Sequence, residues 1–572
     1  CSLLPLGGPE VYELIGKGQT LGVFQLESSG FRELLVRLKP DCFEDVVAAV
    51  ALYRPGPLQT GMVEDFIDCK HGRKRVTYPH PLLEEVLKPT YGGFVYQEQV
   101  MQAAQIMADY SLGGADLLRR AMGKKKAEVM AKERVKFVAG CTAKGIAESK
   151  ATEVFDLMEK FAGYGFNKSH SAAYALITYQ TAYLKAYFPT EFMAALLSTE
   201  VNSTDNIVKY IAEARGMGID VLPPTVNDSD SSFTVDSGAI RFGMSAIKGL
   251  GDSALEAILR ARDEEGSFDS LYAFCERVPL KQLNKKTLET LVRSGAFDCF
   301  GRPRAQLAGA LDGAIEAAKS VQKAAAAGQT SLFGAPELAK AVRPREAYDE
   351  SVREWPELER LKYEKEALGF YVTGHPLDRY AKDLGKLTSA SVSSLENQAH
   401  RAEVHLGVVV TALRERPLRD GSGRMAFLTV EDRTGAVEMM VPASTFQEVE
   451  EILRQDVPLR IKAVVSHDRD DEGHQRTRMR CTGAETLAQA REALAKSVVV
   501  TVPDDQVDPP RLDAFRSLFQ AHRGRCPVRF VVQVRECGDV EIELPKDLAL
   551  APTDAVVDGV EALFGAGSVR FG

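Results

Sequence analysis

The first 225 residues carry apolar side chains at helical spacing. Between Gln97 and Asp109, positions 100, 104, 107 and 108 are apolar, which makes one stripe of an α-helix. Ala151 to Phe161 and Ala172 to Phe188 repeat this spacing, and Pro189 marks a later boundary. The run Arg54-Pro55-Gly56-Pro57 predicts a rigid loop instead, because proline lacks an N–H donor and restricts the residue before it. The N-terminal region is therefore predicted to be mainly helical.

Strand-like alternation replaces the helical spacing after residue 399. Apolar residues alternate at Val404, Leu406, Val408 and Val410. Four further short strands are expected at Met425–Val430, Ala436–Val441, Pro458–Ser466 and Thr477–Cys481. Five strands at this spacing resemble an OB-fold, a small barrel that commonly binds single-stranded nucleic acid. Only Phe427 is well placed for stacking, so a purely structural barrel remains an alternative.

A third pattern begins at Ser497. VVVTVP predicts a strand, Pro510 to His522 a helix, and CPVRFVVQV a second strand that precedes a short acidic one. These elements predict a small α/β domain. The expected fold class is multidomain: a mainly α region with a helix-hairpin-helix, then a β-barrel OB-fold, then the small α/β domain.

Composition is typical of a large protein without membrane segments. The chain has 572 residues and a net charge of -9. No apolar run approaches the roughly 20 residues of a membrane span. The nine cysteines form no C-x-x-C pair, so neither a zinc site nor a disulfide framework is indicated. We expect a reduced, cytoplasmic protein that contacts nucleic acid only through basic patches.

One segment reverses the acidic balance. Between Ser111 and Lys136, eight basic residues stand against three acids. The basic residues are Arg119, Arg120, Lys124, Lys125, Lys126, Lys132, Arg134 and Lys136. Gly113 and Gly114 are expected to precede a helix whose exposed N–H groups add partial positive charge. The segment predicts an anion site, although a solvated basic face is the common alternative.

A second segment, FAGYGFNKSHSAAY, gathers polar and aromatic residues at positions 161 to 174. It contains Tyr164, Asn167, Lys168, His170 and Tyr174. Donors, a point charge and rings in so short a span suit a ligand with a phosphate and a base. His170 alone would more often be a structural histidine.

The run IKGLGDSALEAILRARDEEG is typical of a helix-hairpin-helix. Gly249 and Gly251 flank Leu250 in a short turn that we expect between helices, next to Lys248. Such a turn lets backbone N–H groups approach a DNA phosphate without reading sequence. A weaker candidate is Leu283 to Asp298. An ordinary helical turn is the alternative for both.

Five motifs in order resemble one family. They are VFQLESSGFRELL, ALYRPGPLQTGMV, YQEQVMQ, GGADLLRRAMGKKK and FAGYGFNKSHSAAYA. This series resembles the α subunit of bacterial DNA polymerase III, the C-family replicative polymerase, in its C-terminal half. The resemblance implies six segments: fingers 1–225, helix-hairpin-helix region 226–320, linker 321–345, helical connector 346–398, OB-fold 399–490 and C-terminal α/β domain 495–572.

The resemblance also implies ligands. The fingers of this family close over the template and the incoming nucleotide. It makes Arg119, Arg120, Lys168 and His170 the leading candidates for contacts to the dNTP triphosphate or the template, with Tyr164, Asn167 and Arg54 ranked lower. Lys124, Lys125, Lys126 and the glycine turn at Lys248 are the candidates for contacts to primed DNA and single-stranded template.

Catalysis is not expected from this chain alone. In the family, a palm with three metal-binding aspartates precedes the point that matches Cys1, so Mg²⁺ would be held by the N-terminal half. The acidic runs at 468–472 and 228–230 are interpreted as solvated loops. Cys1 suggests a product of protein splicing, and an incomplete gene is the plainer alternative. A non-catalytic tethering module and the error-prone relative of this polymerase also remain open.

Two partners follow from the C-terminal part. Gln329, Leu332 and Phe333 form a Gln-x-x-Leu-Phe peptide of the kind by which bacterial polymerases hold the sliding clamp. The alternative is that Leu332 and Phe333 fold back on the protein. By position in the family, the C-terminal tail is expected to dock the τ subunit of the clamp loader.

Overall fold

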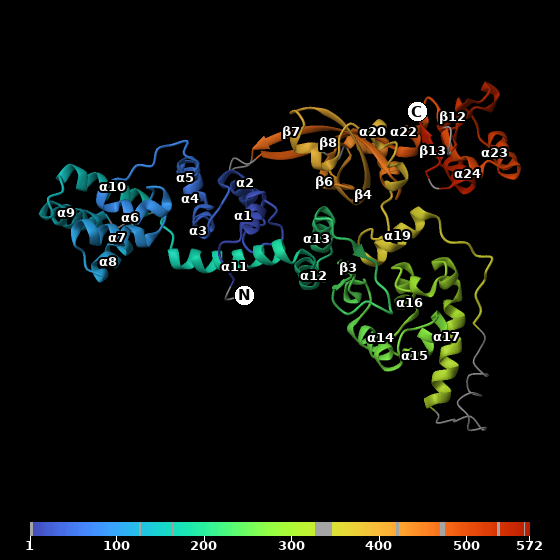
Figure 1. The fold of residues 1–572 in the computed structure, drawn as a ribbon, viewed down its shortest axis with the longest axis horizontal. Helices are drawn as coiled ribbons and strands as arrows, with labels where there is room; N and C mark the ends of the chain where they lie inside the picture. The colour runs from blue at the N-terminus through green and yellow to red at the C-terminus, as the bar shows by residue number, and fades with distance from the viewer. Residues whose placement is uncertain are drawn as a thin grey trace. The chain divides into compact units, whose positions relative to one another are not determined.

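The computed structural model describes residues 4–124, 127–162, 164–326, 346–418, 423–469, 475–534, 538–565 and 567–572. The chain forms two compact units. The first unit contains residues 1–221 and 233–241, and the second contains residues 222–232 and 242–572. Helices dominate the first unit, whereas the second unit adds a barrel and a small sheet near the C-terminus (Figure 1).

The first unit is helical, as predicted. Its larger helices are α1 (Pro9–Gly16), α2 (Ser29–Leu38), α3 (Phe43–Leu52), α4 (Pro55–Gln59), α5 (Met62–Lys70), α6 (Glu84–Leu87), α7 (Gln97–Ala108), α8 (Leu112–Lys124), α9 (Ala127–Ala143), α10 (Glu148–Ala162), α11 (Lys168–Tyr187), α12 (Pro189–Thr199) and α13 (Thr204–Gly216). Pro189 is the first residue of α12, where its missing N–H is not needed.

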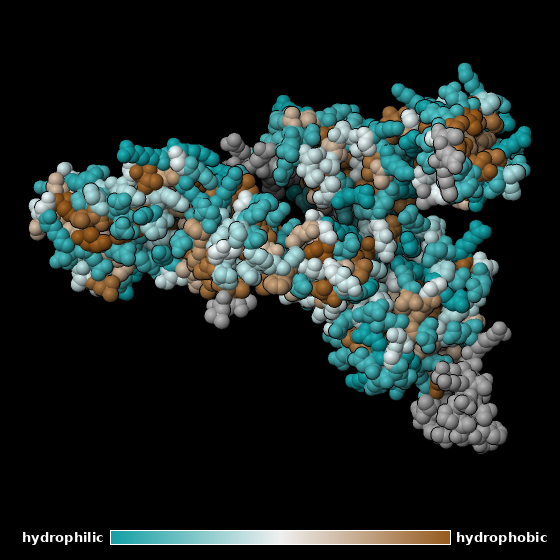
Figure 2. All heavy atoms as spheres, in the orientation of Figure 1, coloured by the Kyte–Doolittle hydropathy of each residue, from teal (hydrophilic) through white to brown (hydrophobic). Residues whose placement is uncertain are grey.

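Two apolar cores organise this unit. One contains residues of α1, α2, α3 and α5 together with the inner face of α11, including Ala175, Tyr179 and Ala182. The other is built by α7, α8, α9 and α10. The surface differs from these cores: on the face shown in Figure 2, most of the area is hydrophilic and the apolar patches are small and separate. The periodic residues of α7 are buried as the sequence predicted, including Val100, Ala104 and Met107.

Two local predictions were wrong. The Arg54–Pro57 segment is not a loop, because Pro55 begins the short helix α4 and Pro57 lies in its first turn. Proline is tolerated there since the first N–H groups of a helix have no intrahelical partner. Gly113 and Gly114 do not precede α8 but lie in its first turn, where the Gly114 N–H donates to Ser111 Oγ at 3.1 Å.

The second unit begins with a helical region. It contains α14 (Asp252–Glu265), α15 (Leu271–Arg277), α16 (Lys285–Arg293) and α17 (Arg304–Ala326), after the short 3₁₀ helix η3 (Met244–Ala246). The connector that follows contains α19 (Glu357–Leu368), α20 (Leu384–Leu387) and the 3₁₀ helices η5 (Asp378–Tyr380) and η6 (Val392–Asn397). The short strands β2 (Thr234–Asp236) and β3 (Ala239–Arg241) belong to the first unit, and β1 (Val221–Leu222) lies at the boundary in sequence between the two units.

The predicted barrel is present. Its strands are β4 (Glu403–Pro417), β5 (Arg424–Asp432), β6 (Gly435–Val441), β7 (Leu459–Arg469) and β8 (Gln475–Thr486). They close in the order β4-β5-β6-β8-β7. The alternate apolar residues of each strand fill the interior, as Leu406, Leu428 and Ile461 do. The helix α21 (Ala443–Leu453), between β6 and β7, was not predicted.

The C-terminal region is the expected α/β domain. Its sheet order is β12-β11-β9-β13, with β11 (Val528–Val534) parallel to β9 (Val498–Pro503). The helix α23 (Pro509–Ala521) lies between these two strands in sequence, as a parallel pair requires. The domain also contains α22 (Leu487–Leu494), β10 (Arg523–Cys526), β12 (Gly538–Glu543), α24 (Asp554–Phe564) and β13 (Val569–Phe571). Among the described residues, no helix is long and apolar enough to cross a membrane.

A buried arginine joins elements of the second unit. The Arg304 guanidinium donates to both carboxylate oxygens of Asp298, at 2.8 and 2.6 Å, and lies 3.5 Å from the fully buried carboxylate of Glu364. Glu364 also accepts hydrogen bonds from the backbone of Val372 and Thr373. The ion pair therefore links α17 to the end of α19.

We predict that Arg304→Ala destabilises this region by about 3–5 kcal/mol, because it leaves the Glu364 charge buried without its cation. Urea unfolding followed by fluorescence of the single tryptophan, Trp355, measures the change. Lys285→Ala is the control, since Lys285 and Asp312 form an exposed pair that contributes about 0–1 kcal/mol. Equal effects of the two substitutions would contradict the prediction.

Candidate nucleotide and nucleic-acid interface

The segment that leads into α11 is fixed by main-chain hydrogen bonds. The backbone N–H of Gln97 donates to Phe166 O at 2.8 Å, and the N–H of Phe166 donates to Val95 O at 3.2 Å. The Gln97 side-chain amide donates to Gly165 O at 3.1 Å. Residues 164–167 therefore run beside residues 95–97, and the start of α7 sets the position of the start of α11.

Asn167 caps α11. Its Oδ1 accepts from the backbone N–H of His170 at 2.9 Å, and its Nδ2 donates to Glu98 Oε1 at 2.8 Å. The other oxygen of Glu98 accepts from the backbone N–H of Lys168 at 2.9 Å. Lys168 and His170 are thereby placed on the first turn, where both are exposed. The side chain of Asn167, predicted as a ligand contact, acts here in capping.

Aromatic rings continue along α11 from this turn. The ring of His170 lies 5.4 Å from Phe166 and 4.4 Å from Tyr174, and Tyr174 lies 5.4 Å from Phe24. The ammonium of Lys168 lies 5.4 Å from the centre of the Tyr96 ring. A cation and a series of rings thus share one surface, which suits a ligand that carries both negative charge and a base.

The two arginines of α8 share one carboxylate. Arg119 donates to Asp116 Oδ1 from Nε and Nη2, at 3.0 and 2.7 Å, and Arg120 Nε lies 2.8 Å from Asp116 Oδ2. The hydrogen bond from Arg119 lowers the pKa of Asp116. Arg119 also donates to Gln97 Oε1 at 3.0 Å. Because two cations face one anion, the group keeps a net positive charge.

Arg54 reaches the same place from α4. Its Nη2 donates to Tyr164 O at 2.8 Å, and its guanidinium lies 4.3 Å from the centre of the Phe166 ring. Burial lowers the pKa of Arg54. The ring of Tyr164 packs directly on Gly56, where any Cβ atom would overlap it. The Arg54 side chain thus holds residues 164–166 in place, because it contacts the backbone carbonyl of Tyr164 and the ring of Phe166.

The structure therefore brings most of the predicted residues together around Gln97. We define the Gln97 cluster as Arg54, Gln97, Arg119, Arg120, Tyr164, Asn167, Lys168 and His170. Sequence reasoning missed the roles of Gln97, Glu98 and Phe166, although all three lie in the quoted motifs. Five further candidates lie outside the described residues: Lys125, Lys126, Gln329, Leu332 and Phe333. The same is true of the Lys124 side chain.

The glycine turn before α14 is open. Gly249 has φ +80°, a conformation that favours glycine, and a Cβ at Gly249 or Gly251 would meet no atom within 4 Å. Gly251 is the N-cap of α14 and Lys248 is exposed, with its N–H donating to Ala367 O at 2.9 Å. The element before the turn is η3, a 3₁₀ helix shorter than the helix we expected. A phosphate can approach the backbone here.

The barrel carries a row of side chains across its outer face. Strand register pairs Arg414 of β4 with Phe427 of β5, Phe427 with Met440 of β6, and Met440 with Arg480 of β8. Phe427 is 41% exposed, whereas its neighbour Leu428 is buried inside the barrel. We name these four residues the barrel row. It combines an aromatic ring with flanking cations, as surfaces that bind single strands do.

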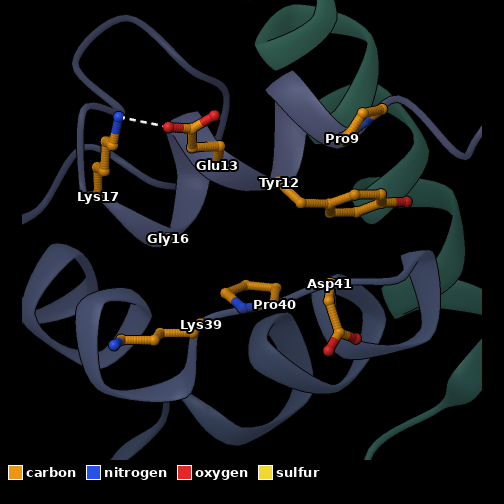
Figure 3. A pocket seen from close by; sticks show the side chains of 8 residues that line it. All are labelled: Pro9, Tyr12, Glu13, Gly16, Lys17, Lys39, Pro40 and Asp41. Carbon is orange, nitrogen blue, oxygen red and sulfur yellow. Dashed lines mark hydrogen bonds and ion pairs between the residues drawn. The ribbon is translucent and has the colours of Figure 1, made fainter.

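The described residues contain one group that could hold a metal, and it does not fit a catalytic ion. Asp41, Cys42 and Asp45 lie together, but Lys70 Nζ already lies 3.0 Å from Asp41 and 2.7 Å from Asp45. Asp41 also lines a cavity between α1 and residues 39–41, where Tyr12 and Pro40 face each other (Figure 3). A divalent ion would have to displace the ammonium of Lys70.

Two segments of the chain match models of known protein families. Residues 1–145 match the model of the "Bacterial DNA polymerase III alpha subunit finger domain". Residues 218–307 match a "Helix-hairpin-helix motif", which confirms that this region contains the predicted helix-hairpin-helix. The polymerase III finger match covers α4, α7 and α8, and therefore includes Arg54, Gln97, Arg119 and Arg120.

Similarity to polymerase III alpha extends along nearly the whole chain. The chain is 42% identical over 569 residues to DNA polymerase III subunit alpha of Vibrio cholerae, covering 98% of this chain and 48% of that protein. The corresponding protein of Pseudomonas aeruginosa is 42% identical over 587 residues, with 99% and 49% covered. That of Escherichia coli K12 is 41% identical over 575 residues, with the same coverage. The chain thus spans about half the length of these relatives.

We predict that Arg119→Ala or Arg120→Ala, tested in a polymerase assembled from this chain and the remaining half of a polymerase III alpha relative, weakens binding of dNTP or primed DNA. A charged hydrogen bond to phosphate contributes on the order of 1.5–3 kcal/mol. Fluorescence anisotropy with primed DNA and titration with dNTP measure the loss. Arg73→Ala is the control, because Arg73 is exposed and pairs with Asp68 outside the Gln97 cluster. Unchanged affinities in both cluster variants would exclude this role.

Proposed function

We propose that this chain is the nucleotide- and DNA-binding C-terminal half of a replicative DNA-directed DNA polymerase, a cytoplasmic nucleotidyltransferase of chromosomal replication. The observation that carries the proposal is the Gln97 cluster, four of whose eight residues lie in the segment that matches the polymerase III alpha finger domain. Identity of 41–42% to polymerase III alpha subunits over 98–99% of the chain supports it.

The cluster suits a triphosphate and a base for different reasons. Arg120 and Lys168 are exposed cations on rigid helices, so they can meet phosphate oxygens directly. Arg119 is held by Asp116 and Gln97, so it can exchange the carboxylate for a phosphate without losing its orientation. His170 and Tyr174 offer faces for a template or incoming base. The dNTP and the template strand are therefore the proposed ligands.

Phosphoryl transfer also needs carboxylates that hold two metal ions at the reacting phosphate. Among the described residues, the group at Asp41 and Asp45 is occupied by Lys70 and does not provide them. We therefore assign Mg²⁺ to the N-terminal half, which makes up the remaining length of the relatives. This chain supplies binding and orientation, and no catalytic residue is assigned to it.

The second unit would hold DNA without reading its sequence. The Gly249 turn offers backbone and Lys248 to a duplex phosphate, and the barrel row offers Phe427 to single-stranded template. These features also favour a second candidate function, a non-catalytic module that tethers DNA to the sliding clamp and the clamp-loader τ subunit. If the chain is half of a replicative polymerase or of its error-prone relative, adding the N-terminal half should produce polymerase activity. If the chain is a tethering module, adding that half should produce no activity.

We predict that a polypeptide of residues 1–572 binds primed DNA weakly and does not extend primers with Mg²⁺ and dNTPs. The Arg and Lys contacts can bind a triphosphate but cannot position metal ions, so their presence does not replace the missing carboxylates. Extension should appear when the N-terminal half is added. Gel-based primer extension measures both states, and salt titration should weaken DNA binding.

Extension by the purified chain alone, after a control for contaminating polymerase, would overturn the assignment of metal binding to the other half. Lack of extension by the assembled halves would instead favour the tethering module.

We predict that Leu332→Ala with Phe333→Ala abolishes processive synthesis by the assembled polymerase but spares short gap filling. The two apolar side chains would fill a pocket of the sliding clamp, and Gln329 would anchor the backbone. Pull-down of the clamp and product length on a long template measure the effect. Wild-type clamp affinity in the double variant would show that the motif has another role.

A further inference from the structure

A cavity of about 300 Å³ lies in the first unit, apart from the cavity of Figure 3. Its walls come from α5, from residues 74–79 and 90–95, and from α10. None of the functions proposed above uses it. Its size is that of small-molecule sites in proteins, which begin at about 300 Å³.

Part of the wall of this cavity is apolar because it lies where the two cores of the first unit meet. Phe66 and Val95 belong to the core that includes α11, whereas Phe94 and Phe161 belong to the core of α7 to α10. Met62 packs against both cores. An apolar ring system would therefore be removed from water by side chains that the fold already holds in place.

The polar lining is cationic. Arg75 and Lys160 are exposed at the cavity, and Lys74 Nζ lies 2.8 Å from Asp65 Oδ1. Three cations thus stand against one acid. An occupant that places an acidic group near Arg75 and Lys160 would gain charge-assisted hydrogen bonds that a neutral occupant could not make.

One residue connects this cavity to the Gln97 cluster. Tyr164 lines the cavity, and its ring packs on Gly56 while its carbonyl accepts from Arg54. A molecule that moves the Tyr164 ring would therefore change the surroundings of Arg54 and of the segment that leads into α11.

We propose that this cavity binds a small amphipathic anion, with an apolar ring body between Phe66, Phe94 and Phe161 and one acidic group at Arg75 and Lys160. Binding regulates the Gln97 cluster through Tyr164. Only this regulatory part rests on the proposed function, because binding itself needs neither DNA nor a polymerase.

The probe is 8-anilinonaphthalene-1-sulfonate, which has an aromatic body and one sulfonate. We expect saturable binding to the 572-residue chain, followed by the rise in probe fluorescence. Cys69 lines the cavity, so bound probe should slow its alkylation by iodoacetamide several-fold. Peptide mass spectrometry reads each cysteine separately. The exposed Cys299 is outside the cavity and should react at an unchanged rate.

Matched variants separate this site from general adsorption of the probe. Leu157 lines the cavity and is 40% exposed, so Leu157→Trp should fill it and abolish the protection of Cys69. Leu176 on α11 is also 40% exposed, and Leu176→Trp should leave the protection intact. Arg75→Glu combined with Lys160→Glu should weaken binding at least tenfold, whereas Arg73→Glu should not.

Protection of Cys69 that survives Leu157→Trp, or probe binding without protection of Cys69, would overturn the site. Wild-type affinity after the double charge reversal would overturn the anionic ligand class. The regulatory part is tested by dNTP affinity of the assembled polymerase with and without the probe. If Cys69 is protected while dNTP affinity stays constant, the cavity is a binding site without the proposed regulation.

Discussion

The geometry of the candidate site depends on the hydrogen bonds of one neutral residue, Gln97. Its backbone N–H and side-chain amide hold residues 165 and 166, and its side-chain oxygen accepts from Arg119. One residue therefore sets the relative positions of α7, α8 and the start of α11. Two charged side chains support the same segment: Arg54 donates to Tyr164 O, and Glu98 accepts from the Asn167 side chain and the Lys168 N–H.

Among the described lysine and arginine side chains, buried ones and exposed ones have different roles. Lys185 and Arg304 are buried, and their donors are used by carboxylates and carbonyl oxygens of the fold. Arg120 and Lys168 are exposed and stand on helices whose starts are fixed by other groups. The buried cations join elements that are distant in sequence. The exposed ones add positive potential to a chain with a net charge of -9, and this potential is local.

Periodicity predicted the fold well where one face of an element is buried. The helix α7 and the five barrel strands were predicted for this reason, although β4 continues to Pro417, well beyond the alternation that ended at Val410. The Pro55 segment was misread because the sequence alone does not show that its prolines lie in a first turn. In the site, charge indicated Arg119 and Lys168. Gln97 lies in the quoted motif YQEQVMQ, but the sequence did not show its role, which depends on residue 166 being beside it. Asn167 caps α11 through Oδ1 and donates to Glu98 through Nδ2, and its contact to a ligand stays a prediction.

The barrel row runs across the strands, so the spacing between neighbouring strands sets its length. Neighbouring strands lie about 4.8 Å apart, so the four side chains from Arg414 to Arg480 span roughly 14 Å. A single strand bound along the barrel row would contact it through a few bases. The length of this contact depends on how many strands contribute a residue and not on how long each strand is. Successive residues of a strand face opposite sides, so inserting one residue in β5 before Ala426 would turn Ala426 outward and the Phe427 ring inward. Insertions are tolerable in the connecting loops, but the strands can change only by substitution if the row is to persist.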